Sequence, residues 1–309
     1  MSERRHGSYD FLGASGRFSK GLLARALATV GVPDEPAYDL ALRAEADLAE
    51  RGANSLDLER LRTLAIDALG EEAGNRTARR LRRLRDLQEL DLPVILLVGG
   101  GTGTGKSTVA TEVAYRLGIT RVTSTDFVRQ TMRAFFSEEF MPTIHFSSFE
   151  AALGLSKAEE EESGDAALLG FLDQTRNVLV GVEAALQRAL DEGWSMVLEG
   201  VHLVPGMLAT DVERALVVQC VLAIHDEEIH RTHFWIRDAA SEGARAHDKY
   251  LSGLPEIRMI QDYIVERARR HDVPVIENES VSGAIAAVVE LVLEAAERAA
   301  RNGSGGRAT

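Results

Sequence analysis

The sequence predicts an α/β fold, in which a parallel β-sheet is flanked by helices, preceded by a smaller region of helices alone. After residue 93, short apolar runs bounded by glycine or acidic residues alternate with longer amphipathic stretches. This alternation is typical of parallel strands joined by helices. The first apolar run leads into a glycine-rich loop and then a helical pattern, VILLVGGGTGTGKST. Before residue 93 the periodicity is helical, with little strand character.

The N-terminal region is expected to contain four helices. Their approximate ranges are 18–27, 36–50, 56–69 and 78–90. Gly31 and Pro33 end the first helix, and Asn54-Ser55 is expected to cap the third. The fourth reads ARRLRRLRDLQEL. Its arginines are expected to form a solvated face while the leucines pack inward; the alternative is a nucleic-acid patch.

The second region is expected to supply the sheet. Its predicted strands cover residues 94–98, 121–124, 195–198, 217–224 and 274–276. The long connection from 126 to 193 is helical in pattern and resembles an inserted cap. We therefore divide the chain into a helical domain (1–88), a sheet domain (89–300) and a disordered tail (301–309).

Charge and composition narrow the function classes. The chain has 309 residues and a net charge of −13, and the whole deficit lies after residue 90. An acidic surface repels polyanions, so we expect no nucleic-acid partner. No apolar run approaches the roughly 18 residues that span a bilayer, and the N-terminus lacks a signal-peptide core. We expect a cytoplasmic protein without a membrane partner, and a homo-oligomer is compatible with the sequence. The single cysteine, Cys220, is expected to be buried in a strand.

The glycine-rich loop matches the pattern G-x-x-x-x-G-K-[ST]. Glycines let the backbone approach a ligand closely, and the positive end of the following helix faces the same point. The lysine adds a charge near the β- and γ-phosphates, and the serine hydroxyl can ligate magnesium. The loop therefore predicts a P-loop NTPase sheet that binds ATP and Mg²⁺. The nucleotide-binding candidates are Gly100, Gly101, Thr102, Gly103, Thr104, Gly105, Lys106, Ser107 and Thr108.

Two acidic residues follow predicted strands, where ligands bind in open parallel sheets. Asp126 follows the second strand and Glu199 the third. With Ser107 they form the predicted metal site, and with Lys106 they are catalytic candidates. Asp126 could instead cap the next helix, and Glu199 could make a structural hydrogen bond. The sequence leaves open which acid holds the metal and which acts as base.

The stretch after the fourth strand has the composition of an arginine-bearing lid. Arg231 and Arg237 are its candidates for neutralising charge in the transition state. The alternative is that each is a surface arginine. His225, His230 and His233 could suggest zinc, but no cysteine or second set of acids accompanies them.

The long connection is expected to form the acceptor pocket. Arg129 and Arg133 lie one helical turn apart and suit a phosphate or carboxylate. They could instead pair with Glu138 or Glu139. The remaining substrate-binding candidates are His145, Ser147, Ser148 and His202.

These residues lie in stretches that resemble the 2-phosphoglycerate kinase family, best known from methanogenic archaea. The stretches are GGGTGTGKST, STDFVRQTMR, MPTIHFSSFEA, VLEGVHLVPG, DKYLSGLPEIRMIQDYI and VPVIEN. The resemblance implies transfer of the ATP γ-phosphate to 2-phosphoglycerate, giving 2,3-bisphosphoglycerate. That acceptor carries a phosphate and a carboxylate, which agrees with Arg129, Arg133 and His145 in its pocket.

Residues 17–88 resemble the ATP-cone domain that precedes the kinase in this family. The resemblance implies that Lys20 contacts a regulatory nucleotide, although YDFLGASG departs from the usual basic strand of such domains. Three other functions stay open: a kinase of another small phosphorylated or hydroxylated acid, a non-catalytic adenine-nucleotide sensor, and a kinase acting on a macromolecule.

Overall fold

The computed structural model describes residues 11–12, 18–90, 92–156, 165–209, 212–240 and 247–305, without the side chains of 235–240, 247 and 303–305. The chain forms two compact units. One comprises Met1–Pro93, Val113–Thr120 and Ala286–Thr309, and the other comprises Val94–Glu112 and Arg121–Ile285. Two later segments thus group with the N-terminal helices.

The first unit contains the four helices expected from the sequence. They are α1 (Lys20–Thr29), α2 (Asp34–Arg51), α3 (Leu58–Leu69) and α4 (Glu71–Glu89). The prediction began α4 too late, because its first two turns carry few apolar residues. It also misplaced the cap of α3: Asp57 Oδ1 accepts a hydrogen bond from the Arg60 backbone N–H at 2.7 Å. That the unit is an ATP-cone domain stays a prediction. Lys20 forms a 3.1 Å ion pair with Glu45.

The arginines of α4 have a role that the sequence did not indicate. The leucines of this helix are buried, as expected. Arg80 and Arg83, however, are only about a quarter exposed and pair with glutamates of α12 (Val281–Gly305). This helix continues into the segment predicted to be a disordered tail, and residues 306–309 lie outside the described part. The basic face of α4 is therefore partly an ion-pair surface within its own unit.

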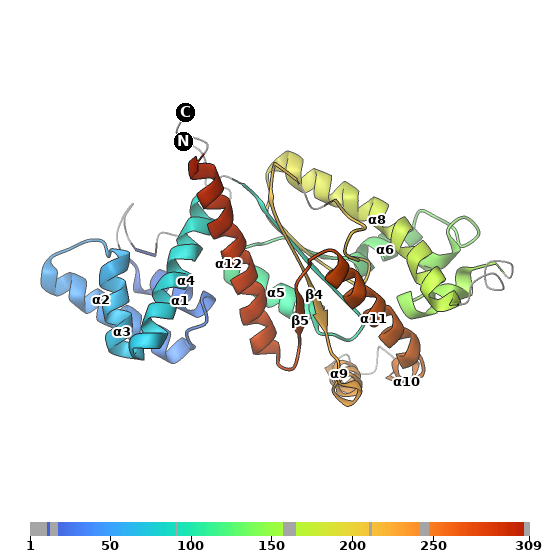
Figure 1. The fold of residues 1–309 in the computed structure, drawn as a ribbon, viewed down its shortest axis with the longest axis horizontal. Helices are drawn as coiled ribbons and strands as arrows, with labels where there is room; N and C mark the ends of the chain where they lie inside the picture. Colours follow the sequence, from blue (N-terminus) through green and yellow to red (C-terminus); the bar gives the residue numbers. More distant parts are fainter. Residues whose placement is uncertain are drawn as a thin grey trace. The chain divides into compact units, whose positions relative to one another are not determined.

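The second unit is built on a five-stranded, all-parallel sheet with the order β2-β3-β1-β4-β5. Figure 1 labels two of its strands, β4 and β5. The strands are β1 (Val94–Gly100), β2 (Val122–Ser124), β3 (Met196–Glu199), β4 (Leu216–Ala223) and β5 (Val275–Glu277). All five predicted strands are confirmed. The chain moves from β1 to one side for β2 and β3, then crosses to the other side for β4 and β5. The loop after β1 thus lies where the strand order reverses, which is the usual ligand site of such sheets.

Helices α8 (Ala166–Glu192) and α11 (Leu254–Arg270) pack on one face of this sheet. The other helices of the second unit are α5 (Lys106–Leu117, which continues into the other unit), α6 (Thr125–Arg133), α9 (Glu227–Ala240) and α10 (His247–Ser252), with short 3₁₀ helices η1 (Pro142–His145) and η2 (Ser148–Gly154). Ile95 and Leu97 of β1 pack with α8, while Val221 and Ala223 of β4 pack with α11. The parallel register puts these positions on the same face.

The central strands are buried on both faces, as parallel sheets require. Cys220 of β4 is fully buried, as predicted, and burial raises the pKa of its thiol to about 12. None of the helices in the described residues is long and apolar enough to cross a bilayer.

Candidate active site

The glycine-rich loop connects β1 to α5 in a conformation that needs glycine. Gly103 and Gly105 have φ values of 84° and 82°, in the left-handed region. A Cβ on Gly103 would lie 2.5 Å from the Phe234 ring, and one on Gly105 would lie 2.5 Å from the Asn278 amide. Substitution at either position would therefore strain the backbone and also collide with a neighbour.

The four carbonyl groups from Gly101 to Thr104 all accept hydrogen bonds from side chains. Their donors are Thr104 Oγ1 and Lys106 Nζ to Gly101, His230 Nε2 to Thr102, His233 Nδ1 to Gly103, and Asn278 Nδ2 to Thr104. In a trans peptide the next N–H points the opposite way from the carbonyl. Holding the Thr102 and Thr104 oxygens therefore directs the N–H groups of Gly103 and Gly105 away from His230 and Asn278, as an anion-binding concavity requires, whereas the Thr104 N–H donates to the Gly101 carbonyl at 3.4 Å.

Lys106 and Glu199 are both buried at the start of α5, with exposed fractions of 8% and 7%. Lys106 Nζ donates to the Gly101 carbonyl at 2.6 Å, and Ser107 Oγ donates to Glu199 Oε1 at 2.9 Å. Burial lowers the pKa of Lys106, while the Glu199 carboxylate acts in the opposite direction. The structure thus brings a lysine, a hydroxyl and a carboxylate together at the phosphate loop.

Asp126 lies in the first turn of α6 and is not its cap. The cap is Ser124, whose hydroxyl accepts from the Phe127 N–H at 3.0 Å. Asp126 Oδ1 instead accepts from both Nε and Nη2 of Arg129, at 3.0 and 2.7 Å. About two thirds of the Asp126 side chain is exposed. A functional role for this carboxylate therefore remains compatible with its position.

Arg129 is buried and all three of its guanidinium nitrogens have partners in the protein. Nη1 donates to the carbonyls of Ile144 and Phe146, both at 2.8 Å, in addition to the bonds to Asp126. The ion pair with Glu138 or Glu139, considered from the sequence, is not the one that forms. In this structure Arg129 links α6 to the loop around η1.

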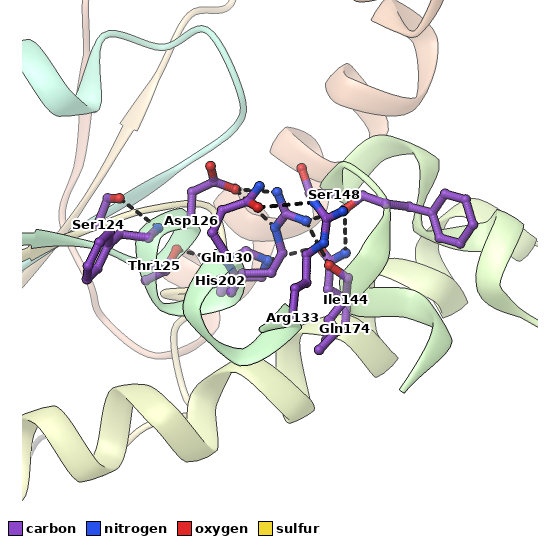
Figure 2. A network of polar contacts seen from close by, with 12 residues as sticks. Ser124, Thr125, Asp126, Gln130, Arg133, Ile144, Ser148, Gln174 and His202 are labelled. Carbon is purple, nitrogen blue, oxygen red and sulfur yellow. Dashed lines mark hydrogen bonds and ion pairs between the residues drawn. The ribbon is translucent and has the colours of Figure 1, made fainter. Parts of the chain in front are cut away.

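His202 belongs to a buried polar network with Thr125 and Gln174 (Figure 2). The Gln174 amide nitrogen donates to the carbonyls of Thr143 and Phe146, so its oxygen faces His202 Nε2 at 3.0 Å. Nε2 therefore carries the proton, and Nδ1 accepts from the Thr125 hydroxyl at 2.8 Å. Burial first, and the Arg129 cation second, lower the pKa of His202 to about 3. The ring is neutral and connects the loop after β3 to α6 and α8.

No family model matches this chain. It is 36% identical to a 2-phosphoglycerate kinase of Methanopyrus kandleri over 89% of this chain and 83% of the other. For the proteins of the same name from Pyrococcus furiosus and Methanothermobacter thermautotrophicus the identity is 37%, over 90% and 93% of this chain and 89% and 94% of theirs. The chain belongs to the 2-phosphoglycerate kinase family. The resemblance stated from the motifs is thereby confirmed.

The other acceptor candidates of this family member lie around η1 and η2. Arg133 is exposed, and its Nη1 donates to Gln130 at 3.1 Å (Figure 2). His145 is partly buried and its Nε2 donates to the Phe136 carbonyl at 3.0 Å. Ser147 immediately precedes η2. Ser148 is buried, and its hydroxyl lies 3.4 Å from that of Thr102 in the phosphate loop. Among these candidates, Ser148 is placed directly against the glycine-rich loop.

The helix predicted to form a lid is α9, but its contact with the phosphate loop is not made by the predicted arginine. Arg231 pairs with Glu227 and Glu228 of its own helix, at 2.7 and 3.7 Å. The side chain of Arg237 lies outside the described residues. The loop is contacted by His230 and His233, as given above. A role for the arginines in transfer stays a prediction.

The zinc alternative finds no support in the described residues. They contain no group of three or more His, Cys, Asp or Glu side chains that could hold a metal ion. His225 pairs with Glu277, the last residue of β5. Each of the three histidines of this stretch thus has a partner within the fold, although the buried Nδ1 of His230 has none among the described residues.

Sequence reasoning missed the side chains that shape the loop from outside. His230, His233 and Phe234 share one face of α9, at helical spacing i, i+3 and i+4. Asn278 directly follows β5, at the carboxyl edge where Asp126 and Glu199 were sought. The helical spacing and the strand-end rule could have identified both features before the structure.

Proposed function

We propose that the protein is an ATP-dependent kinase that phosphorylates 2-phosphoglycerate to 2,3-bisphosphoglycerate, using Mg²⁺. The observation that carries the proposal is the contact between Ser107 and Glu199 next to Lys106, at the switch point of a parallel sheet. The curated relatives are named for this activity. We expect the protein to act in the cytoplasm, as the sequence features suggest.

The residues at the loop fit a magnesium nucleotide. The outward-held carbonyls leave N–H groups for the phosphates, and Lys106 supplies a cation there. Ser107 and Glu199 provide the oxygen donors that Mg²⁺ prefers. When bound, the ion neutralises charge on the phosphates. We assign Glu199 to the metal because it already holds the hydroxyl that phosphate loops direct to magnesium.

Asp126 is our candidate for the general base. Arg129 fixes its Oδ1, which leaves Oδ2 to accept the proton of the acceptor hydroxyl. The acceptor oxygen then forms a bond to the γ-phosphorus as the bond to the β-phosphate oxygen breaks, and ADP leaves. Arg231 and Arg237 remain candidates for neutralising the transferred charge.

Arg133, His145, Ser147, Ser148 and His202 remain our candidates for the acceptor side, together with Arg129. Since Arg129 and His202 are buried and bonded within the protein, we propose that they shape the pocket. Arg133 is exposed and can pair with a carboxylate or phosphate of the acceptor.

The proposal is tested by measuring ADP release with ATP and Mg²⁺, with and without 2-phosphoglycerate. We expect release to depend on the acceptor. Arg133→Ala should raise the KM for 2-phosphoglycerate by about tenfold or more, because the variant loses a charge-assisted contact with the acceptor. The KM for ATP should change little. Arg188→Ala, which removes an exposed arginine of α8, is the matched control.

The metal assignment has its own measurement. Glu199→Gln and Ser107→Ala should raise the Mg²⁺ concentration needed for half-maximal rate. An unchanged metal dependence in both variants would remove these residues from the magnesium site, and ADP release independent of 2-phosphoglycerate would refute the acceptor.

A further inference from the structure

Three elements outside the glycine-rich loop are connected by packed aromatic rings. Phe234 of α9 stacks on Tyr250 of α10, with ring centroids 5.3 Å apart and planes 8° from parallel. Tyr250 in turn packs against Phe149 of η2, at 5.7 Å and a tilt of 50°. We call these three rings the aromatic column. Phe234 and Phe149 are buried and Tyr250 is partly buried, so the column belongs to the core rather than the surface.

One end of the column lies on the phosphate loop. Phe234 is the ring that a Cβ on Gly103 would strike. His230, one turn earlier on α9, stacks on Phe234 at 5.2 Å and donates to the Thr102 carbonyl. If the backbone at residues 102–103 moves, it therefore moves against the rings of His230 and Phe234 rather than into solvent.

The other end lies in residues 142–154, the segment that holds three of the residues proposed above to bind the acceptor. Phe149 directly follows Ser148, and a Cβ on Gly253 would lie 2.5 Å from its ring. Lys249, beside Tyr250 in the chain, forms a 2.6 Å ion pair with Glu150. Two side chains of α10 thus contact two consecutive residues of η2. In addition, the Ser148 and Thr102 hydroxyls lie 3.4 Å apart, so the two loops also meet directly.

We propose that Tyr250 is a positioning residue that couples nucleotide binding at residues 100–108 to the ordering of residues 142–154. The inference rests on the proposed function for what residues 142–154 bind, but not for the coupling itself. Phosphoryl transfer requires both reactants to be held in one geometry while water is excluded. Packed side chains with a discrete arrangement can carry such coupling between two sites. The aromatic column is a packed connection of this kind, in addition to the direct contact between the Ser148 and Thr102 hydroxyls.

Hydrogen exchange of the full chain tests the coupling without any acceptor. Exchange is compared with and without Mg²⁺ and a non-hydrolysable ATP analogue. We expect the analogue to slow exchange in 100–108 and also in 142–154, the latter by about tenfold, a usual size for coupled sites. In Tyr250→Leu the slowing at 100–108 should persist and that at 142–154 should disappear. Tyr250→Phe keeps the ring and should behave as the wild type.

Tyr263→Leu is the matched control, because Tyr263 packs on the same core cluster but is outside the column. It should retain the coupling. Equal loss in Tyr263→Leu would mean that loosening the core is sufficient, and would overturn the role of Tyr250. Retained coupling in Tyr250→Leu, or no effect of the analogue on 142–154 in the wild type, would also overturn it.

If Tyr250→Leu does not fold, Phe149→Leu tests the same column from its other end, with the same expected and contradicting results. Failure of the proposed function gives a different signature. A protein that shows the coupling but does not phosphorylate 2-phosphoglycerate would refute the acceptor and leave the role of Tyr250 standing.

Discussion

Lys106 is buried beside the Glu199 carboxylate, at the start of α5 and directly after the glycine-rich loop. Taking an ammonium group out of water is costly unless a counter-charge compensates it. Burial accordingly lowers the pKa of Lys106, and Glu199 offsets this only in part. The phosphates of a nucleotide would supply the missing negative charge. We therefore expect Lys106 to favour nucleotide binding while it lowers the folding stability of the protein without nucleotide, a trade-off that is common at functional sites.

Lys106→Ala separates these two effects. Turnover should fall by about 100-fold or more, the usual effect of removing one group that stabilises charge in a transition state. The melting temperature without nucleotide should equal or exceed that of the wild type, because an incompletely paired buried charge has been removed. Steady-state kinetics and thermal melting provide the two readings. Near-normal turnover would show that the loop lysine does not act in transfer.

The protonation of His202 leads to a second prediction, which concerns the dependence of stability on pH. Its pKa is about 3 in the folded protein, against 6.5 for an ordinary histidine. Between these values only the unfolded chain binds the proton, so stability declines as the pH falls below 6.5. The slope is about 1.4 kcal/mol per pH unit, which gives about 2 kcal/mol between pH 6.5 and about pH 5.

His202→Gln removes this titration while keeping a hydrogen-bonding side chain. Its stability should therefore decline less than that of the wild type on acidification. Urea unfolding at neutral pH and near pH 5 measures the difference. Carboxylates such as Asp47, whose pKa the hydrogen bond from Arg60 lowers, add acid sensitivity to both proteins and cancel in the comparison. Parallel declines would mean that His202 does not have the lowered pKa.

At the scale of elements, the ion pairs between α4 and α12 make a testable contribution. Arg83 contacts Glu290 and Glu297 while only 24% exposed, so the pairs are less screened than surface ones. Arg83→Gln should lower the free energy of unfolding by about 1–2 kcal/mol, between the values for exposed and buried pairs. The loss should shrink at high salt. Denaturant unfolding measures it.

Arg79→Gln is the control for this prediction, since it removes an exposed arginine from the same helix. It should change stability by only a few tenths of a kcal/mol. If Arg83→Gln and Arg79→Gln change the free energy of unfolding equally, the ion pairs with α12 add nothing beyond the effect of removing one positive charge.

The elements themselves were largely predictable from the sequence, because strand burial and helical periodicity are local signals. The start of α4 was missed because residues 71–77 have little apolar periodicity, and the cap of α3 was assigned two residues too early. The phosphate loop was predictable because its chemistry is contiguous in the chain. Contacts that join distant segments were not: Asn278 and the Thr104 carbonyl are 174 residues apart.

Arg129 illustrates the same limit at the candidate site. Its spacing from Arg133 indicated a shared helical face, but a pattern does not report which arginine the following loop covers. The carbonyls of Ile144 and Phe146 lie over Arg129, so that Arg133 remains exposed. Burial of polar side chains depends on the course of the long connection, which no periodicity specifies.

At the scale of the whole molecule, the parallel sheet brings the candidate groups to one edge. The loop after β1, Glu199 at the end of β3, Asp126 after β2 and Asn278 after β5 all lie at the carboxyl ends of strands. Because the strands are parallel, residues far apart in sequence meet there. Membership of the 2-phosphoglycerate kinase family and this arrangement together lead to the proposed transfer.

The most direct test of that claim is ³¹P NMR of the reaction with ATP, Mg²⁺ and 2-phosphoglycerate. The γ-phosphate signal of ATP should decline while those of ADP and 2,3-bisphosphoglycerate grow together. The new signals should be absent without 2-phosphoglycerate and with Lys106→Ala. Formation of ADP and inorganic phosphate alone, or no change in the ATP signals, would contradict the proposed function.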